Sequence, residues 1–138
     1  MKKSLMTALT AGILVASATT AMAGEIAVIV KTTNSSFWQN VNKGATAAIE
    51  NHGDHTMTFN GPASESAIAD QVALVENAIN RGVAGIVLAP SDPEALAPVV
   101  RRAFESGIPV AIIDSGLAEG SEAYYQTFLS TDNCAAGQ

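Results

Sequence analysis

Short apolar runs alternate with amphipathic stretches along most of the chain. Residues 25–30, 85–88 and 110–113 are nearly continuous apolar runs rich in Val, Ile, Leu and Ala, and residues 56–59 combine β-branched and aromatic side chains. Short runs of this kind, bounded by turn residues, are typical of strands that are buried on both faces. Residues 124–129 form a weaker run of the same type. The pattern therefore predicts five strands.

Between these runs, apolar residues recur at spacings of three and four, as on one face of a helix. Helices are expected over residues 37–50, about 64–80 and 93–106. The residues expected to face the core are Phe37, Val41, Ala45, Ala48 and Ile49 in the first helix, Ile68, Val72, Val75 and Ile79 in the second, and Leu96, Val99, Val100 and Phe104 in the third.

Capping residues support these boundaries. Ser36 and Asp92 are suited to cap helix N-termini, and Gly53 and Gly82 are suited to end helices in the left-handed conformation. A further helix start is indicated at residues 131–133. The alternation of strand and helix predicts an α/β fold with a doubly wound parallel sheet and right-handed crossovers. A mixed α+β arrangement is the alternative.

The first 23 residues have the layout of a secretory signal. Lys2 and Lys3 give a positive start, residues 9–18 are apolar and uncharged, and Ala21 and Ala23 stand at the −3 and −1 positions of a cleavage site. A transmembrane helix needs about 20 apolar residues, more than this segment has. We expect the mature chain to begin at residue 24 and to act outside the cytoplasm, an uncleaved N-terminal helix being the alternative.

Composition narrows the range of partners. The 138 residues suffice for one domain with its own core. Without the signal, five Lys and Arg remain against 13 Asp and Glu, a formal charge of −8. This acidic balance argues against nucleic acid and anionic membranes as partners. Cys134 is the one cysteine, so no intramolecular disulfide is possible. His52 and His55 flank a turn, and neither a metal nor another cofactor is expected.

The loops that follow parallel strands share one edge of the sheet, where ligands bind in α/β proteins. The loops expected at that edge span residues 31–38, 60–66, 89–92 and 114–116. Phe37 and Trp38 lie in the first of them, and a sugar ring packs well on such aromatic faces. Phe37 also fits the core stripe of its helix. Trp38 lies off that stripe, and we favour it as a ligand contact.

A carboxylate, Asp114, follows the fourth strand directly. It can accept hydrogen bonds from neighbouring hydroxyl groups of a polyol, and charge-assisted bonds of this kind are strong. The alternative is an Asx-type turn with Ser115 and the following glycine. Lys31 ends the first strand and either donates to a sugar oxygen or is solvated. We favour ligand contact for Asp114.

Short polar side chains at the same edge complete the candidate site. Asn34 and Ser35 can contact a ligand or help to cap the first helix, for which Ser36 stands at the N-cap position. Ser91 can face the cleft, whereas Asp92 is expected to cap the third helix. Enzyme signatures such as GxSxG, GxGxxG and the P-loop are missing from the sequence.

Several of these segments, taken together, identify a family resemblance. They are residues 27–38 (AVIVKTTNSSFW), 82–92 (GVAGIVLAPSD), 107–110 (GIPV), Asp114 and residues 131–133 (TDN). In combination they resemble the periplasmic sugar-binding proteins of ABC importers, and most nearly the ribose-binding branch of the type I solute-binding proteins. The resemblance runs from about residue 25 to the end of the chain.

The resemblance implies a sugar site at the positions that match the family. It implies ring-stacking aromatics at Phe37 and Trp38, a hydroxyl-binding carboxylate at Asp114, and contact of residues 31–35 with the sugar. It also implies that the chain forms the N-terminal lobe of a two-lobe fold, and we expect the sheet order 2-1-3-4-5.

The chain departs from the ribose binders at three places. Lys31 stands where they have a serine, Ala89 where they have an asparagine, and Ser115 where they have an arginine. Because these positions lie in the expected site, we expect a different pentose, a hexose or a polyol rather than ribose. Ser115 joins the candidate substrate contacts.

The family is longer than this chain, so the chain resembles a fragment. Residues 24–130 are expected to form the N-terminal lobe and residues 131–138 the start of the hinge toward a second lobe. The implied mechanism is closure of two lobes around a sugar, followed by recognition by a membrane permease, with no covalent change. A sensor that presents sugar to a chemoreceptor is one alternative. A secreted α/β hydrolase is another, disfavoured by the missing nucleophile motif.

Overall fold

The computed structural model describes residues 24–137, so the predicted signal segment lies outside the described residues. Five strands form a single sheet in which every paired strand is parallel, in the order β2-β1-β3-β4-β5. The predicted fold class and strand order are therefore confirmed. The elements are β1 Glu25–Ile29, α1 Ser36–His52, β2 Thr56–Asn60, α2 Ile68–Arg81, β3 Gly85–Leu88, α3 Pro93–Glu105, β4 Val110–Ile113, the 3₁₀ turn η1 Glu122–Tyr124, β5 Thr127–Leu129 and α4 Asn133–Ala136.

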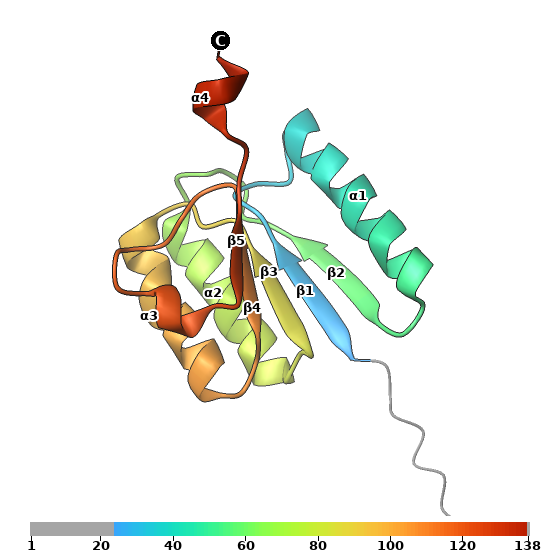
Figure 1. Ribbon diagram of the computed structural model, residues 1–138. Coiled ribbons are helices and arrows are strands. Elements are labelled where there is room, and N and C mark those ends of the chain that lie inside the picture. The colour runs from blue at the N-terminus through green and yellow to red at the C-terminus, as the bar shows by residue number, and fades with distance from the viewer. Residues whose placement is uncertain (1–23, 138) are drawn as a thin grey trace, which may run out of the picture.

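Helices flank both faces of the sheet (Figure 1). Helices α2 and α3 cover one face, and α1 lies on the other, over the side of β1 and β2. The larger core cluster lies beneath α2 and α3, where Ile86, Leu88 and Ile112 of the strands are buried with Val75 and Leu96 of the helices. Among residues 24–137, no helix combines the length and apolar character needed to cross a membrane.

The smaller core cluster lies beneath α1 and corrects the predicted register of that helix. Trp38 is buried, with 3% of its surface exposed, whereas Phe37 is 55% exposed. Trp38 packs with Val28 and Val30, and Val41 and Ala45 adjoin them. The apolar stripe that continues through Val41 and Ala45 is compatible with either Phe37 or Trp38 as its first residue. The structure places Trp38 there. The prediction of Phe37 as a core residue is wrong.

The helix caps agree with the sequence except at α1 and α2. Ser35, not Ser36, caps α1, and its side chain accepts a hydrogen bond from the backbone N–H of Trp38. Helix α2 begins at Ile68, later than predicted, without a side-chain cap. Asp92 caps α3 as expected.

The fifth strand is shorter than predicted. Strand β5 covers only the segment that pairs with β4, while Tyr124 ends the 3₁₀ turn. Tyr124 instead packs edge-on against Phe104, with ring centroids 5.6 Å apart, and the guanidinium of Arg101 lies over its ring. Phe104 is accordingly 47% exposed rather than directed into the core, contrary to the sequence prediction.

Candidate ligand-binding site

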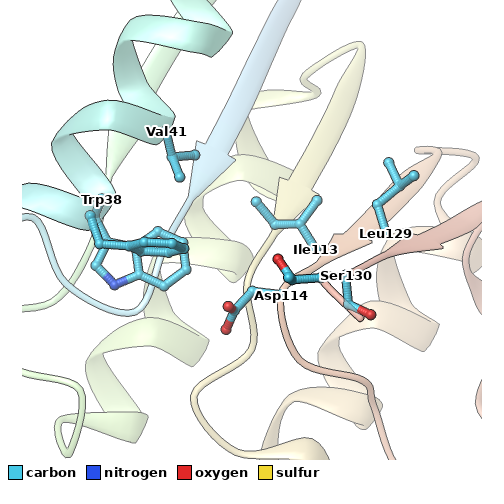
Figure 2. Close-up of a pocket in the computed structure, with 8 residues that line it drawn as sticks. Trp38, Val41, Ile113, Asp114, Leu129 and Ser130 are labelled. Atoms are coloured by element: carbon cyan, nitrogen blue, oxygen red, sulfur yellow. The ribbon is translucent and has the colours of Figure 1, made fainter. Parts of the chain in front are cut away.

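The carboxyl ends of β4 and β5 and the start of α1 surround a hollow of about 260 Å³. This is the edge at which the parallel topology predicts a ligand. Figure 2 shows Trp38 on one side of the hollow and Asp114, Ile113, Ser130 and Leu129 on the other, with the Asp114 carboxylate pointing toward the side of Trp38. The lining residues are Phe37, Trp38, Val41, Ile113, Asp114, Leu129, Ser130 and Thr131.

The two aromatic rings form one wall. The rings of Phe37 and Trp38 meet edge to face, with centroids 4.8 Å apart and planes at 82°. The indole Nε1–H of Trp38 donates to Oε1 of Glu65 over 3.3 Å. Trp38 is thus fixed by packing and by this bond, and Phe37 presents the more exposed ring. Sequence analysis did not single out Glu65, although it lies in the predicted edge loop of residues 60–66.

On the opposite side of the hollow, Asp114 belongs to a bonded triangle of polar side chains, whose other two members, Lys31 and Ser115, lie behind the lining residues. The Lys31 Nζ lies 2.7 Å from Oδ2 of Asp114 and donates to Oγ of Ser115 over 2.7 Å. The Ser115 hydroxyl in turn donates to the same Asp114 oxygen over 3.0 Å. The structure therefore brings together three predicted site residues from loops more than 80 positions apart. A fixed carboxylate beside an ammonium group can accept from one ligand hydroxyl while its neighbour donates to another.

The backbone at Asp114 is also unusual. Its φ of 67° makes it the one non-glycine residue with positive φ within residues 24–137. The N–H of Asp114 donates to the carbonyl of Leu129, and the N–H of Ser115 donates to the carbonyl of Ile113. Aspartate tolerates this left-handed region better than most residues. A tight turn thus follows β4, and the Asp114 carboxylate lines the hollow.

Two other predicted site residues are engaged elsewhere. The side-chain amide of Asn34 donates to the carbonyl of Ala63 over 2.9 Å, joining the loops after β1 and β2. The hydroxyl of Ser35 caps α1. Neither residue lines the hollow. Their predicted contact with a ligand remains a prediction, and the structure gives both side chains a local bonding role.

Ser91, the remaining candidate, lies in the loop after β3. Its hydroxyl oxygen is buried and has no hydrogen-bond partner among residues 24–137, and Ser91 does not line the hollow, so its contact with a ligand remains a prediction. Its backbone N–H donates to Oε1 of Gln71 over 2.8 Å. Gln71 is fully buried in the first turn of α2. Sequence analysis missed it, although a glutamine directly before Val72 on the apolar stripe of a helix is the available signal.

Within the described part of the chain, no three or more His, Cys, Asp or Glu side chains are clustered so that they could hold a metal ion. His52 ends α1, and His55 lies just before β2, at the edge of the sheet opposite the hollow.

Fold and site together are typical of binding domains of the α/β class, with aromatic rings facing a carboxylate at the carboxyl edge of a parallel sheet. A family model for the periplasmic binding protein domain matches residues 26–138. The chain belongs to this family. The resemblance noted in the sequence is thereby confirmed.

Known relatives are named as sugar-binding proteins. A D-ribose/D-allose-binding protein of Pseudomonas aeruginosa is 36% identical over 65% of this chain, and the D-allose-binding periplasmic protein of Escherichia coli is 30% identical over 83% of it. An ABC transporter solute-binding protein from Agrobacterium vitis, solved with bound D-fucose, is 68% identical and superposes with a TM-score of 0.80 over 83% of this chain.

The relatives are much longer than this chain. The chain spans 28% of the Pseudomonas protein, 38% of the Escherichia coli protein and 39% of the Agrobacterium vitis protein. The relatives are binding proteins by name, which supports a role in solute binding rather than catalysis.

Proposed function

We propose that the protein is the substrate-binding component of an ABC sugar importer and that the hollow between Phe37, Trp38 and Asp114 is half of its sugar site. The observation that carries the proposal is the pairing of an aromatic wall with a bonded Lys31–Asp114–Ser115 triangle at one sheet edge. Aromatic rings suit the C–H face of a sugar, and a carboxylate beside an ammonium suits its hydroxyl groups.

Within the sugars, we propose a 6-deoxyhexose such as D-fucose as the ligand. The relative at 68% identity was solved with D-fucose. The hollow also has an apolar side, formed by Val41, Ile113 and Leu129. Burial of a methyl group against such a surface favours binding, whereas the extra hydroxyl of a hexose would lose its hydrogen bonds to water there. D-Fucose is therefore expected to bind more tightly than D-galactose.

The proposed transport role needs a second lobe. We propose that residues 24–130 form the N-terminal lobe and that residues 131–138 begin the hinge, with the other wall of the cleft supplied by the rest of a longer protein. Closure of the two lobes around the sugar then presents a surface to a membrane permease. Residues 1–23 are proposed to direct export to the periplasm, which N-terminal sequencing of the exported protein tests at the Ala23–Gly24 bond.

A hybrid protein tests the function of the lobe directly. In this hybrid, residues 24–137 replace the matching lobe of the Agrobacterium vitis protein, and D-fucose binding is measured by titration calorimetry. The proposal predicts binding by the hybrid, with D-galactose weaker than D-fucose. A folded hybrid that binds neither sugar would contradict it.

A further inference from the structure

Gln71 occupies a position where three backbone groups from two different loops converge. Its Nε2 amide donates one hydrogen bond to the carbonyl of Val30 over 3.1 Å and another to the carbonyl of Ala89 over 2.8 Å. Its Oε1 accepts from the N–H of Ser91 over 2.8 Å. A side-chain amide has two donor hydrogens and an acceptor oxygen, so both hydrogens are used and the oxygen is engaged.

These bonds lie where the β1–β3 ladder ends. The last paired residues of the two strands are Ile29 and Leu88, and the N–H of Ala89 still donates to the carbonyl of Ile29. Val30 and Ala89 follow directly, and both residues are fully buried. A buried carbonyl without a donor is costly, and Gln71 supplies the donor for both.

The same bonds fix the start of the candidate site. The carbonyl of Val30 belongs to the peptide group that leads into Lys31. The Lys31 side chain, in turn, bonds to Asp114 and Ser115. Gln71 is therefore joined to the loop after β4 through one backbone peptide and one side chain. Helix α2 thus holds the loops after β1 and β3 directly, and the loop after β4 through Lys31.

We propose that Gln71 is a positioning residue for the site. It fixes the backbone of the loops after β1 and β3, and thereby the backbone position from which the Lys31 side chain reaches Asp114. The part of this proposal that concerns sugar affinity rests on the proposed function. The part that concerns the loops does not, and the two parts have separate measurements.

The test compares Gln71→Met with Gln39→Met in the 138-residue protein. Methionine has a similar length and packs flexibly, but it has neither the amide donors nor the carbonyl acceptor. Gln39 is the matched control, because its side-chain amide also donates to a loop carbonyl, that of Thr33, at the exposed surface. Amide hydrogen exchange is measured at Ser91 and at Ala89.

In Gln71→Met, the exchange rate of the Ser91 amide is expected to increase. Its fold-increase should be at least about ten times that of the Ala89 amide, whose partner is the Ile29 carbonyl. A purely structural role would accelerate both amides together through global unfolding, which would overturn the proposal. In Gln39→Met neither amide is expected to change. The unsubstituted protein gives a test that does not depend on folding defects in a variant. Its Ser91 N–H must exchange more slowly than an unbonded loop amide, and exchange as fast as such an amide would also overturn the proposal.

D-Fucose affinity, followed by chemical-shift titration, tests the consequence for the site. Gln71→Met is expected to bind at least about tenfold more weakly than the parent, and Gln39→Met within about twofold of it. Unchanged affinity in Gln71→Met would refute a positioning role. If the parent itself does not bind D-fucose while the exchange results hold, the proposed sugar fails and the loop-fixing role of Gln71 is supported.

Discussion

The carboxylate of Asp114 is held at the edge of the hollow by both backbone and side-chain bonds. Its N–H is bonded to Leu129 of the neighbouring strand, the N–H of Ser115 closes the turn on the carbonyl of Ile113, and its Oδ2 is bonded to Lys31 and Ser115. We therefore expect Oδ1 to be the oxygen that accepts from a ligand hydroxyl. A group fixed in this way loses little conformational entropy when the ligand binds.

Asp114→Asn is expected to weaken sugar binding without disturbing the turn. Asparagine tolerates the left-handed backbone at this position, whereas alanine would be strained. Hydrogen bonds to a charged group contribute about 1.5–3 kcal/mol, so the affinity of the hybrid protein should fall at least about tenfold. Calorimetry measures the change. Glu119→Gln, which neutralises an exposed carboxylate outside the hollow, is the control and should leave affinity unchanged.

Substitutions of Phe37 and of Trp38 are expected to have different effects, the first mainly on sugar binding and the second mainly on stability. Phe37 is 55% exposed, so Phe37→Ala should lower the free energy of unfolding little while weakening D-fucose binding. Trp38 is 3% exposed, and truncating a buried aromatic costs about 3–5 kcal/mol of stability. Chemical denaturation and calorimetry measure the two quantities. Equal losses of stability in the two variants would contradict this division of roles.

At the level of elements, an ion pair at the amino end of the sheet joins β1, β2 and α2. The guanidinium of Arg81 lies 2.8 Å from Oε1 of Glu25, and the hydroxyl of Thr58 donates to the same oxygen. The hydrogen bonds from Arg81 and then from Thr58 hold the pKa of Glu25 below its ordinary value of 4.5. Because the pKa is lower in the folded state, these bonds favour folding at neutral pH.

Glu25→Gln should therefore change how stability depends on pH. The contribution of the Glu25 carboxylate is fully present above its unfolded-state pKa and is lost as the pH falls through the lower folded-state value. Parent and variant should differ at pH 7 and converge on acidification through the range below 4.5. Urea unfolding at several pH values measures this. A difference that stays constant down to acid pH would contradict the assignment, and Glu50→Gln, on the exposed surface of α1, is the control.

The elements and their order were predictable because each rests on a local pattern. Apolar runs gave the strands, and Gly53, Gly82 and Asp92 gave helix boundaries through the conformations these residues favour. The register of α1 was not predictable, since Phe37 and Trp38 are adjacent and both are compatible with the stripe that continues at Val41. Tertiary packing against β1 decides between them.

Some residues of the site could be predicted from their place relative to the ends of the strands, and others could not. Asp114 and Lys31 were found because each lies at or just after the end of a predicted strand, and the shared edge of a parallel sheet brings such positions together. Glu65 and Gln71 were missed because their roles are bonds to residues distant in sequence, Trp38 and Val30 among them. Local spacing can place Gln71 on the apolar face of its helix, but it does not identify the distant partners of either side chain.

On the scale of the whole molecule, the two faces of the sheet are covered unequally. On the face of α1, a hollow of about 200 Å³ lies over β1, β3 and β4 and is lined by apolar residues that include Ile26, Val87 and Ala111. At the nearby edge, Phe128 is 44% and Leu129 61% exposed. Tyr125, just before β5, is half-buried against the core. Strands with exposed apolar edges tend to pair with other chains.

Residues 24–138 are therefore expected to self-associate through the β5 edge. Phe128→Lys places a charge on that edge, which disfavours strand pairing, and should shift the protein toward monomer. Sedimentation velocity measures the shift. Phe104→Lys replaces an aromatic residue of similar exposure on α3 and is the matched control. Self-association that responds equally to both substitutions, or not at all, would place the contact elsewhere.

The carboxyl edge of this sheet, as we propose, forms one wall of a sugar site. The most direct test is a chemical-shift titration of residues 24–138 with D-fucose. We predict that the shifted signals are those of the Trp38 indole N–H and of the backbone amides of Phe37, Asp114 and Ser115, with the opposite edge, at Gly53 and Gly107, unchanged. If no signal shifts at the highest sugar concentration, or if the shifted signals lie at the opposite edge, the carboxyl edge is not a sugar-binding surface.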